Sequence, residues 1–435
     1  MKILLVNQNS VDNLGDRAIY QATLDMLAAA FPAAQVTMLF HRTTRARVVF
    51  PGYNIQPSLD SWAYQIAANG TTIHTAAFSR ALALLRLVLV VLVYRLCGRK
   101  LLPFAETERR ATLCAFLEAD LVLACGGGYI YDTSVPHGLL RQLLSIGLWS
   151  SFALGGMLLP LLLGKPLVLL PQSIGPLRDP LRIAVIRWIA RRARLVCVRE
   201  QPSYDLLKQI GAAGRVLIVP DLVFGRASDP HADTAARLLA IGVAPAAAEP
   251  LVGMTSIDWR GQTGDFSAQE RYETAFVACI DDQTKQGARV VLFAQCFSEA
   301  AAWDDRMINR RLRTRAAHPE RVYLHEEIVE PATLQALYGA MDFFIGTRMH
   351  SVILALNTGT PTVTIGYLHK SRGVMAEVGI GAHVIAIDHV SAATLIELVH
   401  QVQQQPAAAT IRAYSIRAQR AHRALGKILA MIDDR

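Results

Sequence analysis

The nonapeptide DFFIGTRMH at residues 342–350 predicts a buried strand, a turn at Gly346 and the start of a helix. A second apolar run at residues 361–366 follows this helix pattern and leads into Lys370. In sheets of parallel strands joined by helices, ligands bind outside the carboxyl ends of the strands, where helix N-termini offer backbone N–H groups to anions. The pattern therefore predicts an α/β fold in which Arg348, His350 and Lys370 surround an anion site that contains a proton-transfer group.

Apolar runs alternate with helical patterns along the whole chain, which is typical of parallel α/β sheets. The expected strands are residues 2–7, 35–40, 120–125, 167–171, 195–198 and 216–219 in the first half, and 251–257, 289–294, 321–325, 342–345, 362–365 and 384–387 in the second. An Ala- and Pro-rich stretch separates the two halves. We therefore expect two doubly wound Rossmann-like domains with an interdomain cleft.

The expected domain boundaries follow from this division of the chain. Residues 1–225 form the N-terminal domain, residues 226–250 a linker with a poorly patterned helix, and residues 251–410 the C-terminal domain. Residues 411–435 carry a basic amphipathic helix pattern. We expect this last helix to pack back at the domain junction.

The charge balance favours an acidic partner. The 435 residues include 44 Lys and Arg against 35 Asp and Glu, a net charge of +9, which suits a phosphate compound, a membrane surface or a nucleic acid. Nucleic acid is disfavoured because the sequence has no zinc-finger spacing, no RNA-reading signature and no basic run interleaved with aromatics. The six cysteines show no CxxC spacing and are expected to be buried, reduced thiols. The first residues turn polar too early for a signal peptide, so we expect a cytoplasmic protein.

Two apolar segments bear on membrane contact. Residues 142–164 are uncharged and long enough to span a bilayer, but Gly, Ser and Pro dilute the signal and the segment lies between two expected strands. A buried crossover helix is therefore the preferred interpretation. Residues 81–94 contain Arg86 and are flanked by Arg80, Arg95, Arg99 and Lys100. This segment either lies on an anionic membrane surface or forms another core helix, and the sequence leaves both readings open.

Polar motifs follow the ends of the first and third strands. The motif Asn13-Leu14-Gly15-Asp16 precedes a helix expected at residues 17–30, with Gly15 permitting a tight turn and Asp16 available as a cap. An ordinary strand–turn–helix would look similar. The glycines Gly126, Gly127 and Gly128 let a ligand or another backbone approach closely. No GxGxxG fingerprint follows the first strand, which disfavours a dinucleotide cofactor.

Further motifs follow the next three strands. Gln172 and Ser173 lie in a polar turn, and Arg199 could offer a planar fork to a carboxylate or phosphate. The alternative for Arg199 is a salt bridge to Glu200 or another neighbour. Asp221 is expected to close a turn or cap a helix. No His, Cys or carboxylate cluster has the spacing of metal ligands, so no metal is expected.

In their order and placement, these motifs resemble those of the polysaccharide pyruvyl transferase family, over roughly residues 1 to 380. The set comprises Asn13-Leu14-Gly15-Asp16, Gly126-Gly127-Gly128, Gln172-Ser173-Ile174-Gly175-Pro176, Arg199-Glu200, Pro220-Asp221, Arg348-Met349-His350 and Tyr367 to Lys370. The resemblance implies a two-domain fold of the GT-B type. It also implies transfer of pyruvate from phosphoenolpyruvate to two hydroxyls of a sugar, which forms a cyclic ketal.

The resemblance implies roles for these residues. Arg199, Arg348 and His350 would be catalytic and lie at the donor site, with Lys370 as a further donor-binding residue on the C-terminal side. Acceptor or cleft loops on the N-terminal side would be formed by Asn13, Gly15, Asp16, Gly126, Gly127, Gly128, Gln172 and Ser173. The chemistry agrees, because a carboxylate and a phosphate require several cations, and an imidazole can act as acid and base in turn. No cofactor beyond the donor substrate is expected.

The acceptor stays open, because residues 73–105 and the Ala-rich linker depart from the family pattern. We expect a sugar or lipid-linked oligosaccharide of surface polysaccharide synthesis, with residues 73–105 resting on the inner leaflet. One alternative is a GT-B-type glycosyltransferase that uses a nucleotide sugar. Another is a non-catalytic, glycan-binding member of the family, against which the intact Arg348-Met349-His350 argues. Binding of phosphoenolpyruvate or of a UDP- or GDP-sugar distinguishes the two enzymes.

Overall fold

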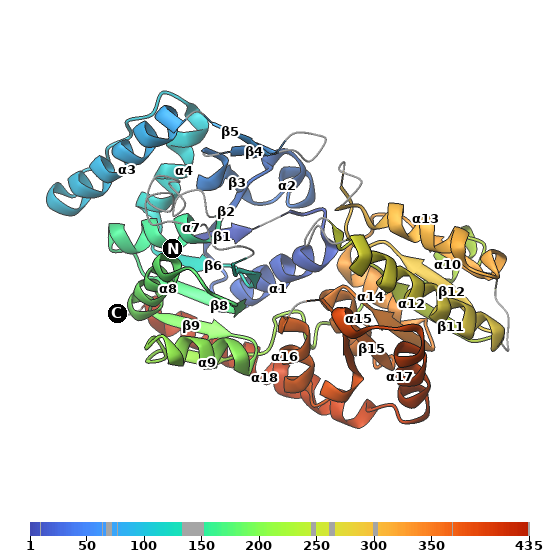
Figure 1. The fold of residues 1–435 in the computed structure, drawn as a ribbon. Coiled ribbons are helices and arrows are strands. Elements are labelled where there is room, and N and C mark those ends of the chain that lie inside the picture. Colours follow the sequence, from blue (N-terminus) through green and yellow to red (C-terminus); the bar gives the residue numbers. More distant parts are fainter. Residues whose placement is uncertain are drawn as a thin grey trace. The chain divides into compact units, whose positions relative to one another are not determined.

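The computed structural model describes residues 1–8, 10–62, 64–66, 72–75, 77–132, 152–244, 249–260, 266–298, 303–367 and 369–433. The chain divides into two compact units. Unit 1 comprises Met1–Val11, Ile19–Leu222 and Ala421–Arg435, and unit 2 comprises Asp12–Ala18 and Val223–Arg420. Each unit contains one parallel sheet with helices along the chain between its strands (Figure 1). The prediction of two parallel α/β domains is confirmed.

Unit 1 has an eight-stranded sheet in the order β10-β9-β8-β6-β1-β2-β3, with β7 paired to β8. Its strands are β1 (Lys2–Gln8), β2 (Gln35–Phe40), β3 (Asn54–Pro57), β6 (Leu121–Ala124), β7 (Gly127–Ile130), β8 (Leu167–Ile174), β9 (Leu195–Val198) and β10 (Val216–Ile218). β4 (Tyr64–Ile66) and β5 (Thr72–His74) form a separate antiparallel pair. The strand order reverses between β1 and β6, so their carboxyl ends flank the switch point of this sheet.

Unit 2 has a six-stranded parallel sheet in the order β13-β12-β11-β14-β15-β16. Its strands are β11 (Leu251–Thr255), β12 (Arg289–Phe293), β13 (Val322–His325), β14 (Phe343–Gly346), β15 (Thr362–Gly366) and β16 (Val384–Ala386). The switch point of this sheet lies between β11 and β14. Both sheets therefore have the doubly wound strand order that places ligands at the carboxyl ends of the central strands.

Most helices of the described residues lie between strands along the chain, and α17 and α18 follow the last strand. They are α1 (Leu14–Ala30), α2 (Thr43–Val49), α3 (Ala77–Cys97), α4 (Thr107–Glu118), α7 (Phe152–Leu163), α8 (Pro180–Arg192), α9 (Gln201–Gln209), α10 (Thr234–Ala240), α12 (Phe266–Lys285), α13 (Asp305–Arg315), α14 (Pro331–Gly339), α15 (Met349–Asn357), α16 (His369–Val378), α17 (Ala392–Gln404) and α18 (Ala408–Asp433). The described residues also form the 3-10 helices η1 (Leu59–Trp62), η3 (Pro319–Arg321), η4 (Gly381–His383) and η5 (Ile387–His389). α10 lies within the segment expected as a linker.

Each strand expected from the sequence is present, with ends shifted by no more than three residues. Central strands such as β6 and β12 are buried along their whole length, because helices cover both faces of a parallel sheet. Continuous apolar runs therefore identified them. β3, β4, β5 and β7 were missed, and β7 contains Gly127 and Gly128, which disguise it as a loop.

The two apolar segments have different surroundings. Met157 and Leu159 of α7 are fully buried in the core of unit 1, which confirms the crossover-helix interpretation for residues 152–163; residues 142–151 lie outside the described part of the chain. α3 buries only one face. Across the described ranges, no helix combines the length and apolar character that crossing a membrane requires.

The cysteines differ in exposure. All six are free. Cys125, Cys197 and Cys279 are buried, as expected for thiols inside apolar runs. The prediction of burial is wrong for Cys97, which is exposed because it ends α3.

Candidate active site

The turn between β14 and α15 places Arg348 and His350 at the switch point of unit 2. β14 lies between β11 and β15 in the sheet. The N–H of Thr347 donates to the carbonyl of Thr255 at 3.0 Å, and the hydroxyls of Thr255 and Ser351 lie 2.6 Å apart. These bonds fix the turn to the end of β11. Arg348 occupies the N-cap position of α15 without capping it, so its side chain remains available for other contacts.

Asp305 anchors the guanidinium of Arg348. Nη2 of Arg348 donates to Oδ1 of Asp305, the first residue of α13, which also accepts backbone N–H bonds from Cys296 at 2.8 Å and Gln295 at 3.1 Å. Asp305 is 1% exposed and Arg348 9%. Burial opposes the charged form of Arg348, but the Asp305 carboxylate outweighs it and raises the pKa of the guanidinium. Nε of Arg348 is buried and has no hydrogen-bond partner among the described residues.

The start of α1 lies against His350. A Cβ added at Gly15 would stand 2.6 Å from Cβ of His350, 2.7 Å from its Nδ1 and 2.9 Å from Nε2 of Gln295. Only glycine allows this approach without displacing a neighbour. The expected reason for Gly15, a tight turn, is wrong: its φ is not positive, and the residue lies in the first turn of the helix.

The segment before α1 is tied to unit 2 by backbone contacts. The N–H of Leu14 donates to the carbonyl of Gln295 at 3.0 Å, and Asn13 forms an antiparallel bridge with Cys296. Oδ1 of Asn13 accepts the N–H of Gly15 at 3.0 Å. The predicted cap, Asp16, is therefore wrong. Asn13 caps α1, because the helix begins at Leu14 and not at residue 17.

These contacts bring Asn13 and Gly15 of the predicted acceptor loop together with Arg348 and His350. Asp16 also affects the Cys296 thiol: burial, opposed by the charge of Arg348 and assisted by the charges of Asp305 and Asp16, raises the pKa of this thiol to about 12. A thiol of this pKa is not a nucleophile at neutral pH. The site therefore combines a fixed cation, an imidazole and a helix start.

Asp305 and Gln295 were missed from the sequence. Gln295 comes just after β12, so the strand-end rule that identified Arg348 could have found it. Asp305 begins a helix after an irregular stretch, and no local pattern marks it.

Lys370 follows the neighbouring strand. It is the second residue of α16, after β15, and is partly exposed. Its ammonium group lies 6.0 Å from the centroid of the Tyr367 ring. Its position at the end of β15 agrees with a basic group near the switch point, and its role in donor binding stays a prediction.

Arg199 belongs to unit 1 and lies in a buried ionic cluster. It is 1% exposed; Nη1 donates to Asp221 and Nε to Oγ of Ser173 at 2.7 Å, while Glu200 lies 3.6 Å from Nε. The salt-bridge alternative from the sequence is thus realised. Asp221, which was expected to close a turn or cap a helix, is this ion-pair partner. Nη2 of Arg199 has no partner within the described ranges, and a donor-site role for Arg199 stays a prediction.

Three buried amides gather at strand ends in unit 1. Asn7, Gln8 and Gln172 are 4%, 0% and 0% exposed, and neither the oxygen nor the nitrogen of any of them has a hydrogen-bond partner in the described chain. Asn7 also has a positive φ of 66°, an uncommon conformation outside glycine. Buried amides are normally paired with protein groups or ordered water, so these three amides are candidates for contacts with water or with a ligand. Asn7 and Gln8 were missed, although they are the first polar residues after an apolar run.

The glycines after β6 serve packing within unit 1. A Cβ at Gly126 would stand 2.5 Å from the carbonyl oxygen of Pro171, and one at Gly127, whose φ is +146°, would overlap the Tyr129 ring. Of the two sequence interpretations, close approach of protein groups is therefore the one observed for these two. Gly128 lies within β7 and is partly buried.

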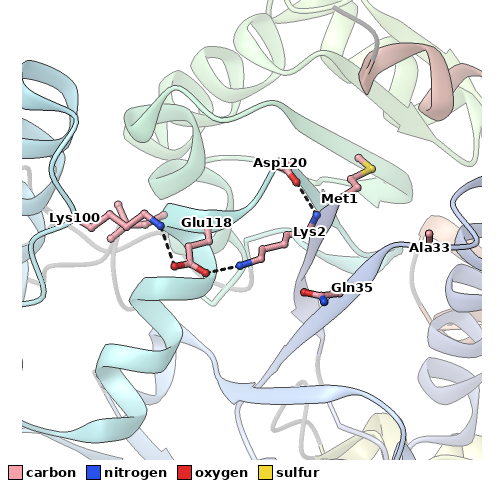
Figure 2. Close-up of a pocket in the computed structure, with 8 residues that line it drawn as sticks. Met1, Lys2, Ala33, Gln35, Lys100, Glu118 and Asp120 are labelled. Carbon is pink, nitrogen blue, oxygen red and sulfur yellow. Dashed lines mark hydrogen bonds and ion pairs between the residues drawn. The ribbon is translucent and has the colours of Figure 1, made fainter.

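A pocket of about 480 Å³ lies elsewhere, at the amino ends of β1 and β2 (Figure 2). Its two lysines, Lys2 and Lys100, both bond to Glu118, at 2.8 and 2.9 Å. These bonds lower the pKa of Glu118 to about 2. Because its charges satisfy one another, this pocket is not the candidate site. No cluster of His, Cys, Asp and Glu arranged to hold a metal occurs in the described residues.

The chain matches known proteins over most of its length. The family model for polysaccharide pyruvyl transferases matches residues 13–369. The amylovoran biosynthesis protein AmsJ of Erwinia amylovora is 24% identical over 403 residues, which cover 87% of this chain and 86% of that protein.

Solved structures share the fold at low sequence identity. HepE of Anabaena, solved in complex with UDP-glucose, has a TM-score of 0.56 at 15% identity, covering 99% of this chain and 98% of that one. A putative UDP-N-acetylglucosamine 2-epimerase of Listeria monocytogenes has a TM-score of 0.56 at 12% identity, covering 100% and 97%. These similarities establish a GT-B-like fold.

Proposed function

The chain belongs to the polysaccharide pyruvyl transferase family, and on this premise we propose that it transfers pyruvate from phosphoenolpyruvate to two hydroxyls of one sugar. The product is a cyclic ketal, and phosphate is released. The observation that carries the proposal is that the buried guanidinium of Arg348, anchored by Asp305, and the imidazole of His350 both follow β14 at the switch point of unit 2.

Donor binding needs cations for a carboxylate and a phosphate. Arg348 donates one N–H to Asp305, and its buried Nε is available to donate to a ligand. The bond to Asp305 holds the guanidinium in place while phosphate leaves. The first turn of α15 adds backbone N–H groups directed at an anion. Lys370, at the end of the adjacent strand, supplies a second positive charge. Arg199 stays a further donor-binding candidate of this proposal, because its Nη2 has no partner among the described residues.

His350 then moves protons. It donates a proton to the methylene carbon of phosphoenolpyruvate, which becomes the methyl group while the neighbouring carbon takes on oxocarbenium character. One sugar hydroxyl adds to that carbon and returns its proton to His350. The second hydroxyl closes the ketal as the C–O bond to phosphate breaks, and its proton leaves with phosphate. Arg348 stabilises the charge that develops on the phosphate.

The acceptor binds in unit 1, where the amides of Asn7, Gln8 and Gln172 each offer donors and an acceptor to sugar hydroxyls. AmsJ takes part in amylovoran biosynthesis, which supports an exopolysaccharide or its lipid-linked precursor as the substrate. We place the reaction at the inner face of the membrane, where a lipid-linked acceptor would be found. The chemistry needs no cofactor, and undiminished turnover after treatment with a chelator tests this.

Replacing His350 tests the proposal directly. His350→Ala should lower the rate of phosphate release from phosphoenolpyruvate, with a lipid-linked oligosaccharide present, by about 10²- to 10⁴-fold. His318→Ala is the matched control, because that imidazole is exposed and contacts only Glu320 among the described groups. Near-normal turnover of the His350 variant would remove the assignment.

A nucleotide-sugar glycosyltransferase is the second candidate, since HepE was solved with UDP-glucose on the same fold. Calorimetric titration with phosphoenolpyruvate and with UDP-glucose separates the two. Binding of UDP-glucose alone would favour the glycosyltransferase.

A further inference from the structure

α3 carries apolar side chains on two opposite faces. Its inner face, with Ala83, Leu87 and Val90, is buried in the core of unit 1. The outer face of α3, as we define it, consists of Phe78, Leu85, Val88, Leu89, Leu92 and Leu96. These side chains are between 47% and 81% exposed, and their spacing places them along one side of the helix. A contiguous exposed apolar stripe of this kind marks an interaction surface.

The position of α3 in its unit leaves the outer face open. The helix lies at the margin of unit 1 and packs on α7 (light blue in Figure 1). Arg86, in the middle of the helix, turns inward and lies 5.7 Å from the centroid of the Phe104 ring. No charged side chain therefore interrupts the outer face of α3 between Leu85 and Leu92.

The charged residues within the segment of α3 are all positive. Residues 77–105 contain four arginines and one lysine and no Asp or Glu. Lys100 is paired with Glu118, whereas Arg95 and Arg99 are exposed at the C-terminal end of the helix, and Arg80 lies at the other end. An apolar stripe between basic ends is the pattern of a helix that lies in the headgroup region of an anionic bilayer.

The positive charge also favours an anionic membrane over a second copy of the chain as the partner of the outer face of α3. Two copies joined through the outer face of α3 would bring like-charged arginines together, which opposes association. Lipid phosphates would instead pair with the same arginines.

We propose that the outer face of α3 docks on anionic lipid, with its apolar side chains at the boundary between headgroups and acyl chains and Arg95 and Arg99 on lipid phosphates. This proposal deepens the proposed function. It rests on that function only for the reason why the protein would dock, which is to reach a lipid-linked acceptor. The docking itself follows from the surface of α3.

Vesicle flotation of the full chain tests the proposal. The protein should float with vesicles of phosphatidylethanolamine and phosphatidylglycerol (7:3) and not with phosphatidylcholine vesicles. The double variant Leu85→Ser/Leu89→Ser should bind at least tenfold more weakly. Val48→Ser is the matched control, because Val48 is an exposed apolar residue of unit 1 on α2 and should not alter flotation.

The arginines give an independent arm. Arg95→Gln and Arg99→Gln should each weaken binding to the anionic vesicles about 5-fold. Equal binding to both kinds of vesicle, unaffected by these variants, would overturn the proposal. So would a wild-type dimer that dissociates in the Leu85→Ser/Leu89→Ser variant without any flotation.

Two further readouts keep the result interpretable. Exposed Cys97, labelled with a polarity-sensitive dye in a Cys114→Ser/Cys296→Ser background, should shift its emission to the blue when anionic vesicles are added. Flotation without this shift would place the contact elsewhere and overturn the proposal. Phosphate release with a water-soluble acceptor fragment should be unchanged in the α3 variants, so failure of docking and failure of the proposed reaction are distinguished.

Discussion

Gly15 is a residue at which two distant segments of the candidate site approach each other closely. A methyl group there would have to displace Cβ of His350, 2.6 Å away, or Nε2 of Gln295, 2.9 Å away. Under the proposed mechanism, a displaced imidazole would no longer meet the donor in the reactive geometry, and a shift of about 1 Å can lower turnover about 100-fold.

Gly15→Ala should therefore reduce kcat about 100-fold in the phosphate-release assay. Gly214→Ala is the control, because a Cβ at Gly214 meets no atom within 4 Å and its φ is not positive. If both variants turn over at the wild-type rate, the close contact with His350 does not matter for catalysis.

The pair of Arg348 and Asp305 has a consequence for the pH dependence of stability. Burial raises the pKa of Asp305, and Arg348 opposes this rise. Arg348→Gln removes that opposition, so the folded-state pKa of Asp305 rises further above its unfolded value. The folded protein then binds a proton that the unfolded chain does not hold, and its stability falls as pH rises through that folded pKa.

Arg348→Gln should therefore be destabilised by about 3 kcal/mol at pH 8, as expected for a buried charge left without its partner, and by less at pH 5. Urea unfolding at the two pH values measures the difference. The control is Arg310→Gln, which removes an exposed pair with Glu326 and should show no such pH dependence. A loss for Arg348→Gln that is equal at both pH values would contradict this account of Asp305.

Among the elements, β1 of unit 1 ends in the buried amides of Asn7 and Gln8, and β8 carries that of Gln172 near its end, all without a hydrogen-bond partner among the described residues. A structural amide would be paired, as Gln269 is: its side chain accepts the N–H of Trp259 at 2.7 Å. Replacing an unpaired amide by an apolar side chain of similar volume removes a desolvation penalty without breaking a bond. The presence or absence of a hydrogen-bond partner thus distinguishes a structural amide from one that is a candidate for binding.

Gln172→Met should leave the free energy of unfolding unchanged or raise it by about 1 kcal/mol, while the KM for the acceptor increases and phosphoenolpyruvate binding is unaffected. Gln269→Met should instead lose stability. A large loss of stability in Gln172→Met, with normal acceptor kinetics, would show that the Gln172 amide has a structural role.

For the whole molecule, the donor should act as a stabilising ligand. Phosphoenolpyruvate at about 100 times its Kd should add about 2.7 kcal/mol to the free energy of unfolding. This stabilisation should be absent in Arg348→Gln, and UDP-glucose should not produce it. Thermal unfolding with each ligand measures these effects, and stabilisation by UDP-glucose alone would reverse the order of the two candidate functions.

The doubly wound architecture could be predicted because its signal is local. A parallel strand covered by helices on both faces is buried along its whole length, as β12 is, and is therefore largely apolar. Such a strand can be predicted from its own residues, without knowledge of the strands beside it. The same holds for Arg348, since the end of a strand can be located from the strand itself. Lys370 was found by the same rule.

Contacts between distant segments required the tertiary structure. The approach of Gly15 to His350, the anchoring of Arg348 by Asp305 and the ion pair of Arg199 with Asp221 join residues far apart in the chain. The sequence around each of these residues does not identify its partner, because an aspartate in a turn, a helix cap or an ion pair can have the same local sequence. Local patterns were therefore sufficient for most strands of the two sheets and for the position of Arg348 at a strand end, whereas packing in space alone selected the partners that orient the charges of the candidate site.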